Sequence, residues 1–413
     1  MEALPTHHAK GIGMMPRVLI VTASVGNGHI SAARAIEEEC ASRGLPVENV
    51  DMIEFTPKAF QTWYRGGYEK AVKDTPKMWG LLYWWSDVPG PLFDIQDWLD
   101  TTFCGKLDGI VERFQPDIVV CVHSLPQPRL DRIRRAGRPF QIAVVVTDMH
   151  PHKMWLRGRP DVFFVPSEWS VERLMSRLPE LQREQIHVVG IPVNRAFAAA
   201  PDEPRSEEPM VVVTSGGIGG GPIVEAVDAL ARMPQRAKIV AVSGRNAAAK
   251  RDLDAHRETL PDWANPVEVR GHVPLAEMAS LVKRCTVLVG KSGGITTYEA
   301  LAAGAPFVVY MPFLIPGQEE QNAVFLADCG AAVQAIDPQD LVQRVGHLLE
   351  SSEDRQAMRE RAFAAAMPHS ARQIVDGLLA SLPRAGADTM GSCPLAETNS
   401  PNAPRRNSAT DSM

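Results

Sequence analysis

The chain has 413 residues, of which 45% are hydrophobic, and this length favours two domains with well-filled cores. Its formal net charge of −6 argues against a nucleic-acid partner, which would favour a basic protein. Six cysteines without CxxC spacing favour buried thiols in a reducing cytosol over a metal site or disulfides. Since no apolar run reaches the ~18 residues of a membrane span and the N-terminus lacks a signal-peptide core, we expect a soluble or peripheral protein.

The chain opens with a segment, residues 1–15, that we predict to be a disordered leader. A buried strand over 17–22 then runs into a glycine loop and a helix over 31–42. This is the opening unit of a Rossmann-like domain, although the spacing is not that of the dinucleotide GxGxxG motif. His29 lies in the loop, and its pKa near neutrality suits acid–base chemistry. The alternative is that His29 only caps or packs the helix start.

The composition changes between residues 60 and 103, where tryptophans and tyrosines interleave with lysines and an arginine. Aromatic rings with nearby cations are typical of a segment that lies at a membrane interface. The alternative is a set of core aromatics beside a solvated face. The candidates for membrane or acceptor contact are Trp79, Tyr83, Trp84 and Trp85.

Two further buried strands, over 116–122 and 141–147, end in polar residues. Asp148 follows the second of them, and catalytic groups gather at the carboxyl ends of strands in open α/β sheets. Asp148 is therefore our second candidate, beside His29, for activating an acceptor hydroxyl. Nearby histidines lack a third ligand, so we predict no metal. Arginines between 129 and 138 could meet lipid phosphates or form a solvated basic face.

Strands over 161–166 and 188–193 are expected to complete the first domain. The stretch 197–209 is rich in alanine, proline and charge, and it predicts an interdomain linker. A second strand–glycine-loop–helix unit follows over 210–233 and echoes the first. This duplication predicts an α/β chain of two successive Rossmann-like domains.

The most informative stretch covers residues 286–333. A short strand leads into a Lys-Ser-Gly-Gly turn and a helix expected to start at Thr296. Unpaired amides at that helix start form an anion site. The polar loop PGQEEQN follows the next strand and brings carboxamide and carboxylate groups that suit sugar hydroxyls. Phosphate on one side and sugar on the other predict a nucleotide-sugar site.

The KSGGIT turn, the Glu299-Ala-Leu helix and the PGQEEQN loop resemble the monogalactosyldiacylglycerol synthases and the processive diacylglycerol glucosyltransferases. The resemblance covers roughly residues 17–382 and implies the GT-B fold, two Rossmann-like domains facing each other across a cleft. The implied units are an acceptor and membrane-facing domain over 16–196, a nucleotide-sugar domain over 210–368, a helix over 369–382 that packs back on the first domain, and a disordered tail over 383–413.

The resemblance also implies how the donor is held. Glycines approach the diphosphate, Lys291 neutralises its charge, Glu299 accepts from the ribose, and the loops over 243–246 and at 273 surround the uracil. The full set of expected donor contacts is Gly28, Gly216, Gly217, Ser243, Arg245, Asn246, Val273, Lys291, Ser292, Gly293, Gly294, Ile295, Thr296, Glu299, Gln318, Glu319 and Asn322.

The leading hypothesis is transfer of a hexose from a UDP-sugar to a lipid hydroxyl, with diacylglycerol as the favoured acceptor, and the resemblance implies inversion at the anomeric carbon. His29 or Asp148 would act as the base, and neither a metal nor a cofactor beyond the UDP-sugar is expected. We expect a cytoplasmic enzyme, peripheral on the inner face of the cell membrane and its anionic lipids. The alternatives are a UDP-GlcNAc transferase or 2-epimerase of the same fold, a transferase acting on a soluble small molecule, and a non-catalytic nucleotide-sugar sensor.

Overall fold

The computed structural model of the chain describes residues 15–24, 27–58, 61, 105–198, 208–217, 219–315, 317 and 319–382. The predicted aromatic contacts Trp79, Tyr83, Trp84 and Trp85 lie outside these residues, and so does Gln318. The expected disordered tail lies outside them too, as do the leader apart from Met15 and most of the predicted linker.

The first lobe is built on a six-stranded sheet in the order β2-β1-β3-β4-β5-β6, and every pair in it is parallel. The strands are β1 (Val18–Thr22), β2 (Val47–Asp51), β3 (Ile118–Cys121), β4 (Gln141–Val145), β5 (Val162–Val165) and β6 (Ile186–Val188). The helices are α1 (Asn27–Ser42), α5 (Leu107–Phe114), α6 (Gln127–Arg135), α7 (Glu168–Arg177) and α8 (Arg195–Ala198).

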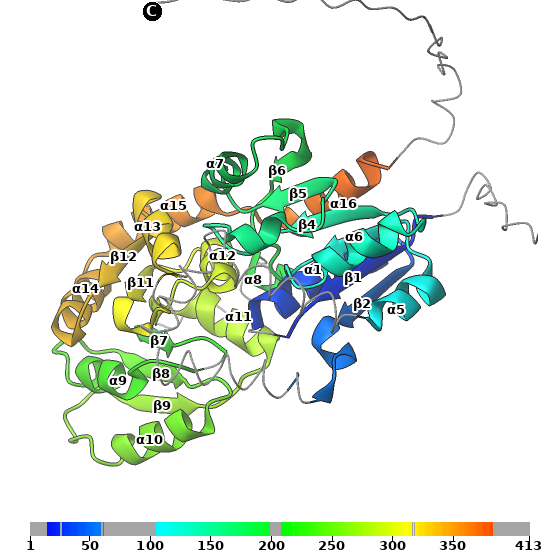
Figure 1. The fold of residues 1–413 in the computed structure, drawn as a ribbon. Coiled ribbons are helices and arrows are strands. Elements are labelled where there is room, and N and C mark those ends of the chain that lie inside the picture. Colours follow the sequence, from blue (N-terminus) through cyan, green and yellow to red (C-terminus); the bar gives the residue numbers. More distant parts are fainter. Residues whose placement is uncertain are drawn as a thin grey trace, which may run out of the picture.

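The second lobe repeats this plan with the order β12-β11-β10-β7-β8-β9, again wholly parallel. Its strands are β7 (Met210–Thr214), β8 (Lys238–Val242), β9 (Val267–Arg270), β10 (Val287–Gly290), β11 (Phe307–Tyr310) and β12 (Ala332–Ala335). Its helices are α9 (Ile223–Ala231), α10 (Ala247–Arg257), α11 (Leu275–Arg284), α12 (Gly294–Ala303), α13 (Glu320–Asp328), α14 (Pro338–Glu350), α15 (Ser352–Ala365) and α16 (Ser370–Ala380). Figure 1 shows the two lobes side by side, so the predicted α/β fold with two Rossmann-like domains is confirmed.

The apolar strands form cores on both faces of each sheet because neighbouring side chains of a strand point in opposite directions. In β1, Leu19 and Val21 join a cluster with α5 and α6, whereas Val18 and Ile20 join one that contains residues of α1. The latter cluster continues into the second lobe, where it includes Tyr298 of α12. A shared core therefore fixes the two lobes against each other.

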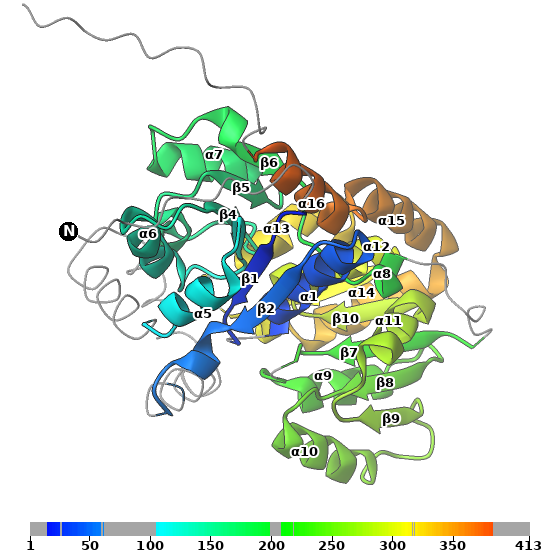
Figure 2. The same cartoon turned by 90° about the vertical axis from the view of Figure 1, so that its right-hand side faces the viewer.

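The last helix, α16, returns from the second lobe and lies along α1, as Figure 2 shows. Arg43, directly after α1, and Asp376 of α16 form an ion pair of 2.5 Å. Gly377 allows close packing, because a Cβ atom there would lie 2.7 Å from the ring of Phe164 in β5. The return of α16 therefore ties the end of the described chain to the first lobe.

Three predicted boundaries are wrong in ways that bear on function. The helix expected from Ser31 begins at Asn27, so His29 lies in the first turn of α1 and not in a loop. The helix expected from Thr296 begins at Gly294. The strand expected over 188–193 ends at Val188, since Gly190 adopts a φ of +81° that a strand does not accommodate.

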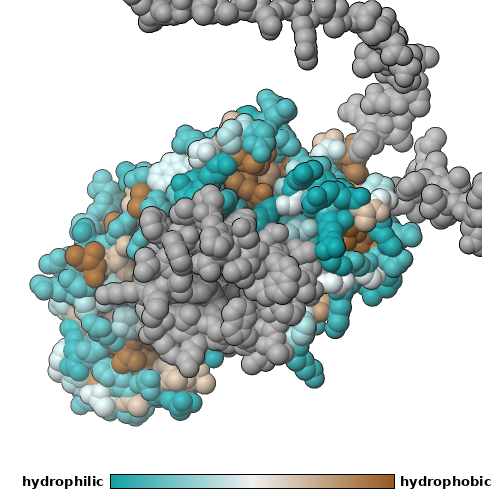
Figure 3. All heavy atoms as spheres, viewed as in Figure 1, coloured by the Kyte–Doolittle hydropathy of each residue, from teal (hydrophilic) through white to brown (hydrophobic). Residues whose placement is uncertain are grey.

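The described surface shown in Figure 3 is largely hydrophilic, with separate apolar spots. Large exposed apolar side chains, such as Trp169 in α7 and Trp263 and Ile336 in loops, lie far apart in the sequence. Within the described residues, no helix combines the length and the apolar character that a membrane crossing demands.

Candidate functional site

The two lobes meet where the first turns of α1 and α12 approach the end of β4. A Cβ atom on Gly28 of α1 would lie 3.5 Å from the Ile295 side chain of α12. A Cβ atom on Gly294 would lie only 2.2 Å from the carbonyl oxygen of Thr147, just beyond β4. Glycine at 294 therefore lets the start of α12 pack directly against the first lobe. The predicted base and the predicted anion site are neighbours for this reason.

The imidazole of His29 is held in one tautomer by its partners. Its Nδ1 lies 3.0 Å from the carbonyl oxygen of Val122 and 2.9 Å from the hydroxyl oxygen of Thr147. Because a carbonyl oxygen only accepts hydrogen bonds, Nδ1 carries the proton, and Nε2 keeps its lone pair. Burial lowers the pKa of His29 below its ordinary value of 6.5, although the charge of Asp148 opposes this. A neutral imidazole with a basic Nε2 is suited to accept a proton at pH 7.

The second predicted base, Asp148, is held by a partner that was not among the predicted site residues. One carboxylate oxygen accepts a 2.7 Å hydrogen bond from the indole Nε1 of Trp155, which is buried. The negative charge of Asp148 raises the pKa of His29, so it stabilises the imidazolium that forms when His29 takes a proton. This geometry favours His29 as the base and Asp148 as its electrostatic support.

A second histidine, His123, also lies in this cluster and was likewise not predicted. Its ring centroid lies 4.7 Å from that of His29, with the planes at 73°. The Trp155 ring lies 6.5 Å from the His123 ring. A sequence signal did exist, since His123 follows closely after β3 and parallel strands present their carboxyl ends to one edge of the sheet.

The start of α12 has the properties of an anion site. Its N-cap is Gly293, which offers no side chain to the amides of the first turn, so these amides remain available as donors. Two buried hydroxyl groups, Ser215 Oγ just after β7 and Thr297 Oγ1 in α12, have no hydrogen-bond partner among the described residues. Both residues are at most 1% exposed. Uncapped amides at a helix start can hold a phosphate group.

Lys291 and Glu319 were predicted to contact the donor, but here they contact each other. The Lys291 Nζ lies 2.5 Å from one oxygen of Glu319, and the other oxygen accepts a 2.9 Å hydrogen bond from the Ile315 amide. The Lys291 side chain passes directly over Gly216, where a Cβ atom would lie 2.7 Å from the Cε atom of Lys291. A diphosphate bound at α12 would therefore compete with Glu319 for the Lys291 ammonium.

The PGQEEQN loop is tied to the glycine turn by two further hydrogen bonds. Ser292 donates its hydroxyl to the carbonyl of Glu319 at 3.0 Å, and Asn322 donates its amide to the carbonyl of Ser292 at 2.6 Å. The Asn322 Oδ1 is buried without a partner in the described structure. The two motifs therefore lie at one place, with polar atoms remaining for a ligand.

The loops expected around the uracil have mostly structural side-chain roles. Ser243 donates to the carbonyl of Arg270 at 3.3 Å, and Asn246 caps α10 while donating to the Gly219 carbonyl at 2.7 Å. The Gly217 carbonyl accepts from the Arg245 amide at 3.1 Å, and the Arg245 side chain is exposed. The predicted contacts with the base would therefore have to come from the backbone and from Arg245. Val273, in the following loop, is partly exposed.

Glu299, near the middle of α12, lies beyond the first turn that carries Gly294, Ile295 and Thr296. Burial raises the pKa of Glu299 to about 8. At pH 7 its carboxyl group is therefore mostly protonated and can both donate and accept hydrogen bonds.

Residues 29–193 match the family model described as monogalactosyldiacylglycerol (MGDG) synthase, and residues 223–365 match that of the glycosyl transferases group 1. A processive diacylglycerol beta-glucosyltransferase of Bacillus pumilus is 26% identical over 381 residues, which cover 88% of this chain and 94% of that protein. The enzyme of the same name from Bacillus cereus strain AH820 is 28% identical over 378 residues, with the same coverage. The resemblance seen in the motifs is confirmed. The chain is a GT-B glycosyltransferase.

Solved structures of low sequence identity share the fold of this glycosyltransferase. MurG of Acinetobacter baumannii has a TM-score of 0.58 at 16% identity, over 88% of this chain and all of that one (100%). A UDP-N-acetylglucosamine 2-epimerase has the same TM-score of 0.58 at 15% identity, over 92% of this chain and 100% of that one. At such identities the likeness concerns the architecture of the two lobes alone.

The basic helix α6 of the glycosyltransferase is largely neutralised by carboxylates. Arg129 makes two hydrogen bonds, of 2.7 and 2.6 Å, to the carboxylate of Asp108. Further ion pairs join Arg134 to Asp161, Arg135 to Asp131 and Arg138 to Glu112. Because four of the five arginines over 129–138 are paired, this face fits the solvated interpretation better than the lipid-phosphate one.

No group of three or more potential metal ligands occurs among the residues that the structure describes.

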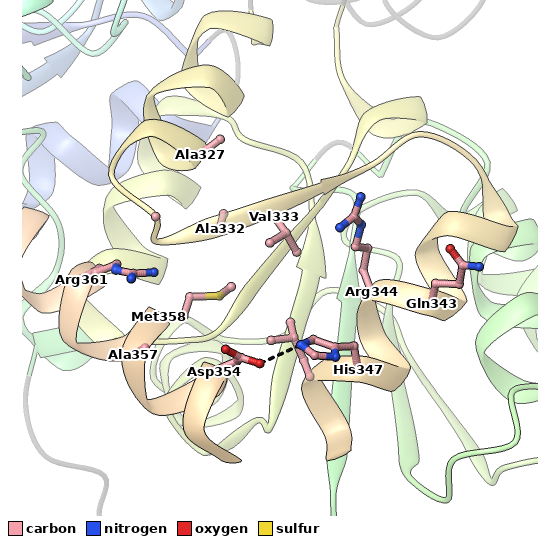
Figure 4. Close-up of a pocket in the computed structure, with 12 residues that line it drawn as sticks. Ala327, Ala332, Val333, Gln343, Arg344, His347, Asp354, Ala357, Met358 and Arg361 are labelled. Atoms are coloured by element: carbon pink, nitrogen blue, oxygen red, sulfur yellow. Dashed lines mark hydrogen bonds and ion pairs between the residues drawn. The ribbon is translucent and has the colours of Figure 1, made fainter. Parts of the chain in front are cut away.

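One further feature of the glycosyltransferase lies apart from the site between the lobes. A cavity of about 630 Å³ opens between α13, β12, α14 and α15, where His347 pairs with Asp354 at 2.7 Å (Figure 4). None of the predicted donor contacts lines this cavity.

Proposed function

We propose that this glycosyltransferase moves a hexose from a UDP-sugar to the hydroxyl group of diacylglycerol, with inversion at the anomeric carbon. The observation that carries the proposal is the meeting of His29 and the start of α12, which brings a neutral base of one lobe beside the anion site of the other. The names of the relatives, processive diacylglycerol beta-glucosyltransferases, support the acceptor class.

The proposed reaction is a single displacement. The acceptor oxygen bonds to the anomeric carbon while its proton passes to His29 Nε2. The bond from that carbon to the phosphate oxygen breaks, and its electron pair leaves with UDP. The amides of the first turn of α12 and the ammonium of Lys291 stabilise the charge that develops on the leaving group. Inversion requires base and leaving group on opposite faces of the sugar, and in the proposed complex the two lobes would hold them there.

We further propose that no metal takes part in the proposed reaction. Backbone amides and Lys291 supply the positive potential that a divalent cation gives other transferases. Turnover should be the same in EDTA as in added Mg²⁺ or Mn²⁺. Loss of turnover in EDTA that returns with Mn²⁺ would overturn this part of the proposal.

The membrane part of the proposal concerns the inner face of the cell membrane and its anionic lipids. It rests on the aromatic and cationic composition of residues 60–103, which the structure does not describe apart from residue 61. Replacing Trp84 and Trp85 with serine should reduce sedimentation with vesicles that contain anionic lipid. Unchanged sedimentation would remove this segment from the proposal.

The test of the function is product identification. The protein is incubated with diacylglycerol vesicles and, in separate reactions, with UDP-glucose, UDP-galactose and UDP-GlcNAc. The proposal expects a β-linked glycosyldiacylglycerol, identified by mass spectrometry and by the NMR coupling of the anomeric proton. Conversion of UDP-GlcNAc to its 2-epimer without an acceptor, or transfer only to water-soluble alcohols, would replace the proposal with one of its alternatives.

A further inference from the structure

The two histidines of the site are fixed in opposite tautomers. His29 carries its proton on Nδ1, because that atom faces the Val122 carbonyl. His123 is the reverse case, since its Nδ1 accepts a 3.0 Å hydrogen bond from the Leu125 amide. An amide only donates, so Nδ1 of His123 is unprotonated, and the neutral ring carries its hydrogen on Nε2. One ring therefore offers an acceptor to a substrate, and the other offers a donor.

The surroundings keep His123 neutral over the working range of the enzyme. Burial lowers its pKa well below the ordinary value, and the neighbouring His29 and the Arg157 guanidinium act in the same direction. Asp148, which accepts a hydrogen bond from Trp155, acts in the opposite direction on the pKa of the neighbouring His29. The ring is not fully enclosed, since His123 remains partly exposed. Its Nε2–H is thus a fixed and uncharged donor on a partly exposed side chain beside His29.

We infer that His123 orients the acceptor lipid by donating this hydrogen bond to an oxygen beside the attacking hydroxyl group. The inference rests on the proposed function. In 1,2-diacylglycerol, the C2 ester supplies such an oxygen, because C2 is bonded directly to the carbon that bears the hydroxyl group. With the hydroxyl proton directed at His29 and the ester oxygen held by His123, the glycerol end of the lipid is fixed at two points. Two contacts define the direction of attack, whereas one contact leaves the hydroxyl group free to rotate.

The test pairs variants of the protein with acceptors that have or lack the neighbouring oxygen. His123→Phe keeps an aromatic ring and removes the donor, whereas His123→Gln retains an N–H near the position of Nε2. His187→Phe, at an exposed position of β6, is the matched control. Each protein is assayed with diacylglycerol and with a long-chain primary alcohol in the same vesicles, and its UDP affinity is measured by calorimetry.

With diacylglycerol, His123→Phe should raise the KM for the acceptor roughly tenfold, the range of one neutral hydrogen bond. With the simple alcohol it should have little effect, because that acceptor lacks the oxygen that His123 contacts. The fraction of donor lost to hydrolysis should rise, His123→Gln should recover much of the loss, and the affinity for UDP should stay the same. An equal loss with both acceptors, or a weaker affinity for UDP, would show a structural role and overturn the inference. A wild-type protein that makes no glycolipid would instead refute the proposed function.

Discussion

The two lobes contribute polar groups to the site in different ways. In the first lobe, His29 and His123 bind backbone atoms and each keeps one ring nitrogen for a substrate. In the second lobe, Lys291 and Glu319 bind each other. In the proposed reaction, the acceptor side would therefore be arranged before any substrate arrives, whereas the donor side would have to exchange an internal ion pair for contacts with the donor. Substitutions in each lobe can break or sharpen this difference.

The largest effect is expected for His29→Ala, which removes the base that the first lobe holds in place. Turnover should fall by ~10²–10⁴-fold, the usual contribution of a positioned general base. The affinity for UDP should remain near that of the wild type, because the anion site belongs to the second lobe. Turnover is measured by glycolipid formation and affinity by calorimetry.

His187→Ala, in the same lobe but exposed, is the control for His29→Ala. A His29→Ala protein with full turnover would show that the cluster is not the catalytic centre. If the wild-type protein binds UDP but shows no turnover with any acceptor, the sensor alternative would fit instead.

The second prediction concerns the contact that brings the lobes together. Gly294→Ala places a methyl group 2.2 Å from the Thr147 carbonyl oxygen, which is far too close for a carbon atom. Such overpacking should lower the free energy of unfolding by about 1–3 kcal/mol and reduce turnover as well. Gly220→Ala is the control, since a Cβ atom there meets nothing within 4 Å. Equal melting temperatures for the two variants would contradict the close approach of α12 to β4.

The third prediction addresses the ion pair of the second lobe. Lys291→Met should weaken UDP binding roughly tenfold. In the wild type, Lys291 would leave Glu319 and form a charge-assisted contact with the diphosphate, and the variant cannot form that contact. Binding of uridine, which has no phosphate, should change little. If both ligands weaken equally in calorimetry, Lys291 supports the loop and does not contact the diphosphate.

The smallest effect is a pH dependence at Glu299. Its pKa of about 8 means that the carboxyl group loses its proton as the pH rises through that value. A carboxylate accepts from ribose hydroxyls more strongly than a neutral acid does, so uridine binding should tighten by about fivefold between pH 6.5 and 9. Glu299→Gln should flatten this profile. A wild-type affinity that is constant or falls over the same range would contradict a role for Glu299 at the ribose.

Much of the fold could be predicted because buried parallel strands are continuous apolar runs. The segments VLIVT and MVVVT differ clearly from their glycine-rich surroundings, and both are strands in the structure. Helix starts were less accurate. Gly28 and Gly294 lie inside first turns, where glycine is usually taken as a loop residue, and tertiary contacts decide the outcome.

The site was predicted only in part, for a related reason. The glycine turn and the polar loop are local motifs, whereas the partners of His29 are distant in the sequence. Val122 is 93 residues from His29, and Thr147 is 118 residues away. The pairing of Lys291 with Glu319, 28 residues apart, also depends on how two loops close. Side-chain partners of this kind follow from the packed sheet edge and not from any one stretch of residues.

The central claim is that a neutral base of the first lobe lies beside the diphosphate site of the second, and NMR of histidine-labelled protein tests it most directly. The spectrum of His29 should show the Nδ1–H tautomer and a pKa below 6.5 without ligand. Adding UDP should raise that pKa by roughly 0.5–1 unit, because the diphosphate places negative charge close to the ring. A His29 ring with its proton on Nε2, an ordinary pKa and no response to bound UDP would contradict the account.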